Sequence, residues 1–281
     1  HILNVGPNNV LQPFLSGKVL GVMLIAASFG LGLAFMPKTE SREVLLKGIL
    51  GFQELFFTLI KALLAILPVG ILAFAGQLSA QIEAGVIVGA LGKYTLVIMA
   101  SNGIQFFLVL PLFLLARGLN PIDVFKKMSP AIAVALFTKS SAGTLPVTLA
   151  SAEKNLKANP AVSRFVLPIC TTINMNGCAA FILITSLFVM QNAGIELSMT
   201  TMLTWLIVAV LAAVGNAGVP MGCYFLTLSL MSGIGAPIGI MGLILPIYTI
   251  IDMIETAENV WSDSCVCAMT DHDLKGKLNQ E

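Results

Sequence analysis

Five polar residues near the end of the chain have types and a spacing suited to binding a charged small molecule or an ion. They are Asp252, Glu255, Thr256, Asn259 and Asp263. Offsets of 0, +3, +4, +7 and +11 place them on one stripe of an α-helix. A carboxylate inside a membrane costs about 2.5–3.5 kcal/mol even on insertion scales, so such acids need partners or a cation. The alternative is a surface helix whose acids face water, but the uncharged stretch 234–248 that leads into the stripe favours a buried binding face.

The composition is that of an integral membrane protein. Hydrophobic residues make up 57% of the chain and charged residues 10%, whereas a soluble domain carries about 25% charged residues. The net charge of +1 gives no support to a nucleic-acid-binding role, and no basic cluster or aromatic platform indicates one. Five cysteines lie in or beside apolar segments, and Cys265-Val266-Cys267 lacks the companion ligands of a zinc site. The cysteines are therefore expected to be small core residues rather than a disulfide framework.

Apolar segments alternate with loops whose basic residues mark the cytoplasmic side. Region 121–153 has basic residues on both flanks, and region 198–233 has none at either end. Each region must therefore leave the membrane by the face that it entered. This predicts two re-entrant helical hairpins, one from each side, with tips at 138–146 and 215–222 and a cytoplasmic C-terminus. Paired broken segments of this kind are typical of transporters with inverted repeats.

A further break is expected between the hairpins, inside the apolar segment 165–189. Residues 171–177 read Thr-Thr-Ile-Asn-Met-Asn-Gly, which is a poor helix former at the centre of a span. Unwinding there would free backbone carbonyls, which are hard oxygen ligands suited to a small cation. The alternative is a glycine kink whose asparagines bond to a neighbouring helix.

These motifs resemble those of the dicarboxylate/amino-acid:cation symporters, the family of sodium-coupled glutamate, aspartate and neutral amino-acid carriers. The resemblance covers about residues 19–271 and rests on the segments 140–146, 174–177 and 217–220 and on the polar stripe of the last helix. It implies an all-α, multi-span homotrimer in a membrane, here a bacterial inner membrane, with earlier helices of the family missing. Residues 1–79 would end the trimerisation scaffold, residues 80–271 would form a transport domain that moves like an elevator, and residues 272–281 would be a cytoplasmic tail.

The resemblance also implies a site for each ligand. Asp252 would hold the ammonium group of an amino acid, and Asn259, with amides near Ser141 and Val219, would hold its carboxylate. The other substrate-binding residues would be Lys139, Ser140, Cys178, Glu255 and Thr256. One Na⁺ would bind the Asp263 carboxylate and the carbonyls of Cys170, Asn174 and Asn259. A second would bind the carbonyls of Thr172, Val214 and Asn216 near the Met175 sulfur. No organic cofactor is implied.

Three positions depart from the family pattern, and the first of them bears most on the substrate. Glu255 stands where glutamate carriers have an arginine, so a carboxylate on the substrate side chain would be repelled. Lys139 could compensate, or could neutralise Glu255 and leave a pocket for a neutral side chain; the bacterial serine/threonine branch has an acid at this point. Asn176 replaces an aspartate, and Cys178 replaces a threonine. We therefore expect Na⁺-coupled import of a small, neutral amino acid.

Other functions fit the sequence less well. The main alternative is a proton- or sodium-coupled carrier of glutamate, aspartate or another dicarboxylate. A channel, or an inert relative of the carriers, is a further alternative. An intramembrane hydrolase using Ser140 or Ser141 would need a general base, but the two histidines, His1 and His272, lie outside the apolar segments. We therefore expect no enzymatic activity.

Overall fold

The computed structural model describes residues 10–11, 19–52, 54–55, 58–59, 65, 69, 76, 88–216, 218 and 220–275. The chain divides into two compact units, His1–Val86 and Ile87–Glu281. Among the described residues every regular element is a helix, which confirms the predicted all-α class. The first unit contains α2 (Val19–Phe35) and a helical stretch over residues 40–52. Most of the second predicted apolar segment, 49–75, lies outside the described residues.

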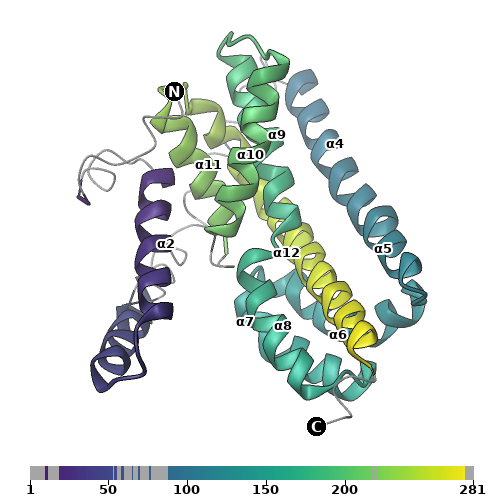
Figure 1. Cartoon of the computed structure of the whole chain (residues 1–281). Coiled ribbons are helices and arrows are strands. Elements are labelled where there is room, and N and C mark those ends of the chain that lie inside the picture. The colour runs from purple at the N-terminus through teal and green to yellow at the C-terminus, as the bar shows by residue number, and fades with distance from the viewer. Residues whose placement is uncertain are drawn as a thin grey trace. The chain divides into compact units, whose positions relative to one another are not determined.

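The second unit is a bundle of helices around one long central helix (Figure 1). Its elements are α4 (Val88–Ile104), the π-helix η2 (Gln105–Val109), α5 (Leu110–Ala116), α6 (Pro121–Thr138), α7 (Ser141–Ser151), the π-helix η3 (Ala152–Leu156), α8 (Pro160–Ile173), α9 (Asn176–Asn192), α10 (Met199–Val214), α11 (Gly222–Gly233) and α12 (Gly239–Leu274). Three stretches in the described part are long and apolar enough to cross a membrane: Leu91–Ala116, Pro160–Asn192 and Gly239–Leu274.

Side-chain caps set the ends of the first helix pair, α6 and α7. The Asn120 carboxamide accepts a hydrogen bond from the Ile122 amide at 3.0 Å, and Pro121 fits the first helical position. Lys139 ends α6 in the left-handed conformation, with φ of 53°. The Ser140 hydroxyl then caps the Gly143 amide at 3.0 Å. Because this cap restarts the helix at Ser141, the irregular tip is shorter than the predicted 138–146.

The second helix pair, α10 and α11, is joined by residues 215–221, of which 217 and 219 lie outside the described set. Ser198 caps the start of α10 by accepting a hydrogen bond from the Thr201 amide at 3.1 Å. Met221 precedes α11 in the left-handed conformation, with φ of 62°. Both helices of the pair pack against α9. Re-entry of the two pairs from opposite membrane faces stays a prediction.

The remaining break divides α8 from α9. Asn174 and Met175 have ψ angles of 60° and 66°, outside the helical region, so the interruption predicted within 171–177 is confined to two residues. The 36-residue α12, yellow in Figure 1, packs against α4, α6, α8 and α9. It thereby brings its polar stripe against the break and the first helix pair.

Candidate functional site

The tips of both helix pairs meet at the break between α8 and α9. The Ser140 hydroxyl donates a hydrogen bond to the Gly218 carbonyl at 2.8 Å, which joins the two tips. A Cβ atom on Gly218 would lie 2.9 Å from the Thr171 carbonyl, 3.1 Å from the Met175 methyl and 3.3 Å from the Ala142 amide. Three chain interruptions that are far apart in sequence therefore converge on one point.

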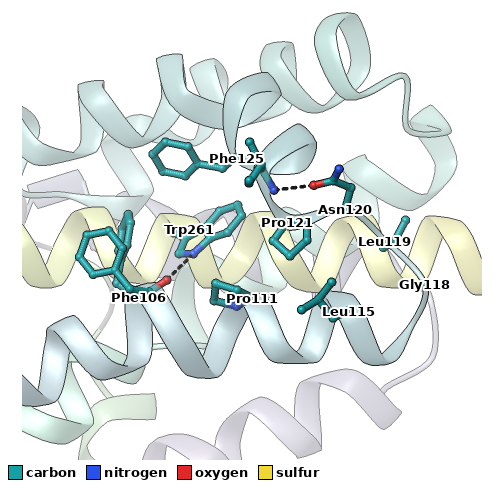
Figure 2. Close-up of a pocket in the computed structure, with 11 residues that line it drawn as sticks. Phe106, Pro111, Leu115, Gly118, Leu119, Asn120, Pro121, Phe125 and Trp261 are labelled. Carbon is teal, nitrogen blue, oxygen red and sulfur yellow. Dashed lines mark hydrogen bonds between the residues drawn. The ribbon is translucent and has the colours of Figure 1, made fainter.

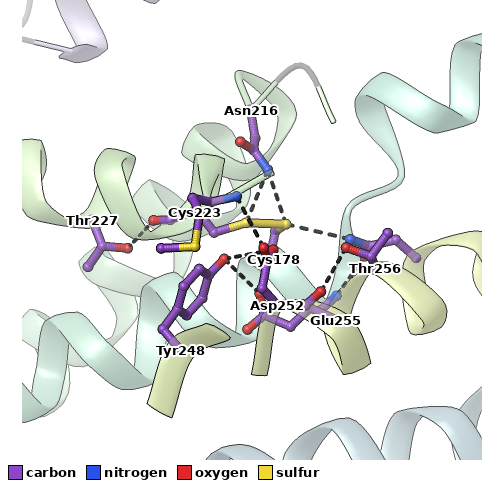
Figure 3. The surroundings of a disulfide bond; sticks show 11 residues. Cys178, Asn216, Cys223, Thr227, Tyr248, Asp252, Glu255 and Thr256 are labelled. Atoms are coloured by element: carbon purple, nitrogen blue, oxygen red, sulfur yellow. Dashed lines mark hydrogen bonds between the residues drawn. A yellow bond between two sulfur atoms is a disulfide. The ribbon is translucent and has the colours of Figure 1, made fainter. Parts of the chain in front are cut away.

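Two buried carboxyl groups of α12 lie beside this point. Asp252 is 4% exposed and Glu255 is 1% exposed. The Met221 amide donates to Asp252 Oδ2 at 3.2 Å, and the Tyr248 hydroxyl lies 3.3 Å from an oxygen of each acid. Figure 3 shows Tyr248 directed at both groups. A phenol has one proton to donate, and within the described structure Glu255 Oε1 has no hydrogen-bond partner. The pair is therefore short of donors, as expected of a site that receives a cationic group.

Asn259, on the same stripe, holds the start of α9 against α12, whereas Thr256 bonds within α12. The Asn259 carboxamide oxygen accepts a hydrogen bond from the Gly177 amide at 2.9 Å. A Cβ on Gly177 would lie 3.0 Å from Glu255 Cα, so only glycine allows this approach without a shift. The Thr256 hydroxyl donates to the Asp252 carbonyl at 2.8 Å.

Asp263 lies one helical turn further along α12 and is completely buried. Its Oδ1 accepts a hydrogen bond from the Asn174 carboxamide at 2.9 Å, whereas its Oδ2 has no partner among the residues that the structure describes. The Ser262 hydroxyl accepts from Asn174 at 2.9 Å and from Asn176 at 2.8 Å. A buried, unpartnered carboxylate oxygen beside an interrupted helix fits a hard cation such as Na⁺.

The structure places the other residues of the predicted site as follows. Ser141 is buried in the first turn of α7, and Lys139 ends α6 at the first tip. The Cys170 carbonyl accepts a hydrogen bond from the Asn174 amide at 2.9 Å. The side chains of Thr172 and Val214 are exposed, although their predicted roles use the backbone carbonyl. Val219 lies outside the described residues.

The prediction that the cysteines are only core residues is wrong for two of them. Cys178 on α9 and Cys223 on α11 form a disulfide across 45 residues of sequence. Asn216 lies beside this bond, and its side-chain nitrogen donates to Cys178 Sγ at 3.2 Å and to Cys223 Sγ at 3.0 Å. The free cysteines of the described part, Cys170, Cys265 and Cys267, are buried.

Sequence reasoning missed Tyr248, Met221 and Ser262. Tyr248 lies four residues before Asp252, which places it on the same helical stripe. That spacing was a usable signal. Met221 contributes its backbone amide, which every residue except proline has, so the residue type could not predict this contact.

A separate apolar hollow of about 720 Å³ lies between α5, α6 and α12 (Figure 2). Its lining includes Phe106, Phe125 and Trp261, and the Trp261 indole donates to the Phe106 carbonyl at 3.2 Å. Because its lining contains no charged side chain, this hollow is not the candidate site for an ion or a charged substrate.

Comparison with known proteins identifies the family of the chain. The model of the sodium:dicarboxylate symporter family matches residues 1–273. Excitatory amino acid transporter 1 of Ambystoma tigrinum is 31% identical over 93% of this chain and 48% of its own length. Excitatory amino acid transporter 3 of Mus musculus is 30% identical over 94% of this chain and 50% of its own length.

Excitatory amino acid transporter 1 of Homo sapiens is 31% identical over 93% of this chain and 48% of its own length. The chain thus spans about half the length of these relatives. They are transporters and not enzymes, which agrees with the absence of enzymatic activity expected from the sequence. The chain, an integral membrane protein with a buried acidic stripe facing three helix interruptions, belongs to the sodium:dicarboxylate symporter family.

Proposed function

We propose that the whole protein is a secondary active symporter that imports a small amino acid together with Na⁺. The observation that carries the proposal is the meeting of Gly218, Ser140 and Met175 beside the buried acids of α12. Two helix tips and an unwound segment supply backbone amides and carbonyls at one place. Such groups can hold the carboxylate of an amino acid and a desolvated cation.

Two of the predicted ligand roles, those of Asp252 and Asp263, have direct physical support. Asp252 is buried and accepts hydrogen bonds from Met221 and Tyr248, so a substrate ammonium would complete its shell. Asp263 has a free oxygen suited to Na⁺. We assign the first Na⁺ to Asp263 with the carbonyls of Cys170, Asn174 and Asn259. The second is assigned to the carbonyls of Thr172, Val214 and Asn216.

We favour a neutral substrate over an acidic one. The Glu255 carboxylate is buried, and one of its oxygens has no partner within the described residues. A second carboxylate on the substrate would be repelled by it at low dielectric. The competing proposal is a dicarboxylate substrate, coupled to Na⁺ or to protons. It is supported by the family's description and by Lys139 at the first tip.

The transport cycle that we propose is an elevator movement in a homotrimer of a bacterial inner membrane, with the C-terminus in the cytoplasm. Residues 1–79 would belong to the scaffold and residues 80–271 to the moving part. The second tip, residues 215–221, would act as the gate. The Met221 amide of this tip donates a hydrogen bond to Asp252, so opening the tip would expose the substrate position.

Uptake into proteoliposomes tests this function. Under an inward Na⁺ gradient we expect the whole protein to concentrate labelled serine or alanine more effectively than labelled aspartate. Replacing Na⁺ by choline at constant pH should abolish the uptake, whereas Na⁺-independent uptake driven by a pH gradient would indicate proton coupling. Asp252→Ala should abolish amino-acid binding, and a loss confined to Na⁺ affinity would contradict its assignment. No uptake of any of these amino acids would overturn the proposal.

A further inference from the structure

Three potential metal ligands lie beside the second tip, and two of them, Cys178 and Glu255, also belong to the predicted substrate site. They are Cys178 on α9, Cys223 on α11 and Glu255 on α12, and all three are buried. The two sulfur atoms and a carboxylate oxygen of Glu255 lie within 4.8 Å of one another. Figure 3 shows the sulfur pair between Asn216 and the acids of α12.

We propose that the reduced Cys178–Cys223 pair and Glu255 form a binding site for a thiophilic divalent cation of the zinc class. Two thiolates and a carboxylate are ligand types that Zn²⁺ and similar ions accept in proteins. Sodium is a hard cation that prefers oxygen ligands to thiolates, so this thiolate site is chemically distinct from the carbonyl and carboxylate sites assigned to Na⁺. In the disulfide form the sulfurs bond to each other and the site is closed.

The surroundings of the three ligands support a cation there. Glu255 is 1% exposed, and its Oε1 has no hydrogen-bond partner in the described part of the chain. A buried carboxylate oxygen without a partner is costly, and a metal ion would satisfy it. The neighbouring Asp252 adds negative charge to the same region. The Tyr248 hydroxyl is shared between the two acids and can donate only one hydrogen bond, so it cannot satisfy both carboxyl groups.

Amide groups are already directed at the sulfur atoms. The Asn216 side chain donates to both sulfurs, at 3.2 and 3.0 Å, and the Asn259 side chain donates to Cys178 Sγ at 3.5 Å. Donors of this kind stabilise negative charge on sulfur, and they are the partners that orient thiolate ligands around a metal. The arrangement therefore suits a thiolate pair as well as a disulfide.

Reduction and metal binding convert the disulfide form into the metal-bound form in two steps. A phosphine reductant and one water molecule convert the disulfide to two thiols, and the phosphine becomes a phosphine oxide. One divalent cation then replaces the two thiol protons and binds the two thiolates and the Glu255 carboxylate. Binding therefore releases two protons for each ion. The ligands come from α9, α11 and α12, so a bound ion would tie the second tip to α12.

Titration of the purified chain with Co²⁺ and Cd²⁺ tests the proposal. After reduction with a phosphine in the absence of oxygen, we expect thiolate-to-metal charge-transfer absorption that saturates at one ion per chain, with two protons released. The same chain left oxidised should show no such band until it is reduced. This comparison needs no substitution and no transport, so it is independent of the proposed symport.

Substitutions then identify the ligands. Cys178→Ser and Cys223→Ser should each abolish the charge-transfer band. Each should weaken metal binding by more than roughly 10–100-fold, which is the loss in metal affinity when a residue that only hydrogen-bonds to a ligand is replaced. Glu255→Gln should weaken binding but keep a thiolate band. Cys265→Ser, which replaces a buried free cysteine elsewhere on α12, should behave as the wild type. No band in the reduced wild type, or a band that persists in either Cys178→Ser or Cys223→Ser, would overturn the proposal.

Discussion

At the scale of single residues, the site is dominated by two buried acids that share one hydroxyl. The Tyr248 ring packs on Phe181 with ring centres 4.4 Å apart, which fixes its hydroxyl between Asp252 and Glu255. The hydroxyl can donate to one acid at a time. The other acid must then find a proton or a cation, and this is the physical basis for a substrate ammonium at this position.

The variant Tyr248→Phe should separate the role of the hydroxyl from that of the ring. It removes a donor from two buried acids, so we expect the free energy of unfolding to fall by about 1–3 kcal/mol. Affinity for the amino acid should fall about tenfold, since a hydrogen bond to a charged group is worth about 1.5 kcal/mol or more. Denaturant unfolding in detergent and equilibrium binding measure the two effects.

Tyr94→Phe is the matched control for this prediction. Tyr94 is equally buried, and its hydroxyl bonds to Thr185 at 2.9 Å instead of to an acid of α12. It should lose stability while keeping its affinity for the amino acid. Equal affinity losses in the two variants would show that Tyr248 acts only through packing.

Single residues also show how far the sequence could be interpreted. The stripe from Asp252 to Asp263 was predictable because the helical period alone places those side chains on one face. The disulfide between Cys178 and Cys223 was not, because it depends on how α11 folds back against α9. Sequence spacing carries information within one helix and little information across a tip.

At the scale of elements, three interrupted helices end at the same place. The breaks themselves were predictable from glycine, proline and asparagine in apolar segments. Their lengths were not, because caps decide where a helix resumes. Ser140 both caps the Gly143 amide and bonds to the Gly218 carbonyl, so one side chain sets the start of α7 and its contact with the second tip.

Gly218→Ala should disturb the junction of these elements. Gly218 has φ of +63°, and an added Cβ would lie 2.9 Å from the Thr171 carbonyl, a backbone atom that cannot move alone. We expect about 1–2 kcal/mol of backbone strain and about 1–3 kcal/mol of crowding. The second tip should then become more sensitive to proteolysis and amino-acid binding should weaken.

Gly194→Ala provides the control, because Gly194 has φ of +74° with nothing within 4 Å of an added Cβ. It should show the strain without the crowding and should bind amino acid normally. Equal destabilisation in the two variants would contradict a close contact between the second tip and Thr171.

An ion pair joins η3 to the start of α8 and should make their packing depend on pH. Arg164 bonds to both carboxylate oxygens of Glu153, at 2.8 and 3.1 Å. The hydrogen bonds from Arg164 hold the pKa of Glu153 below its ordinary value. A lowered folded pKa means that the pair stabilises the protein above the ordinary glutamate value, about 4.3, and that this stability is lost as the pH falls through the lowered value.

Glu153→Gln should therefore lower the melting temperature slightly at pH 7, and the difference from wild type should shrink as the pH falls below about 4.3 and disappear once Glu153 is protonated in the folded protein. Because Arg164 is 68% exposed, added salt should also reduce the difference. Glu196→Gln, at an exposed loop acid, should change the melting temperature at neither pH. A difference that grows as the pH falls would contradict the assigned direction.

At the scale of the whole molecule, composition alone predicted a membrane protein, and three long apolar helical stretches of the described chain agree with it. The two compact units divide between residues 86 and 87, and the boundary between scaffold and transport parts at 79 and 80 stays a prediction. The chain spans about half the length of these relatives, and its described part contains three interrupted segments and the acidic stripe. It should therefore bind ions without the remaining length.

Sodium should stabilise the chain as it stands. A ligand that binds only the folded state raises the free energy of unfolding by about 2.7 kcal/mol at 100 times its dissociation constant. We expect the melting temperature to be higher in NaCl than in choline chloride at equal ionic strength. Asp263→Asn should abolish this difference because the free Oδ2 is lost.

Glu258→Gln is the control. Glu258 is equally buried on α12 and makes none of the Asn174 contacts, so the variant should keep the higher melting temperature in NaCl. If Asp263→Asn keeps the full response and Glu258→Gln loses it, the ion binds on the other face of α12.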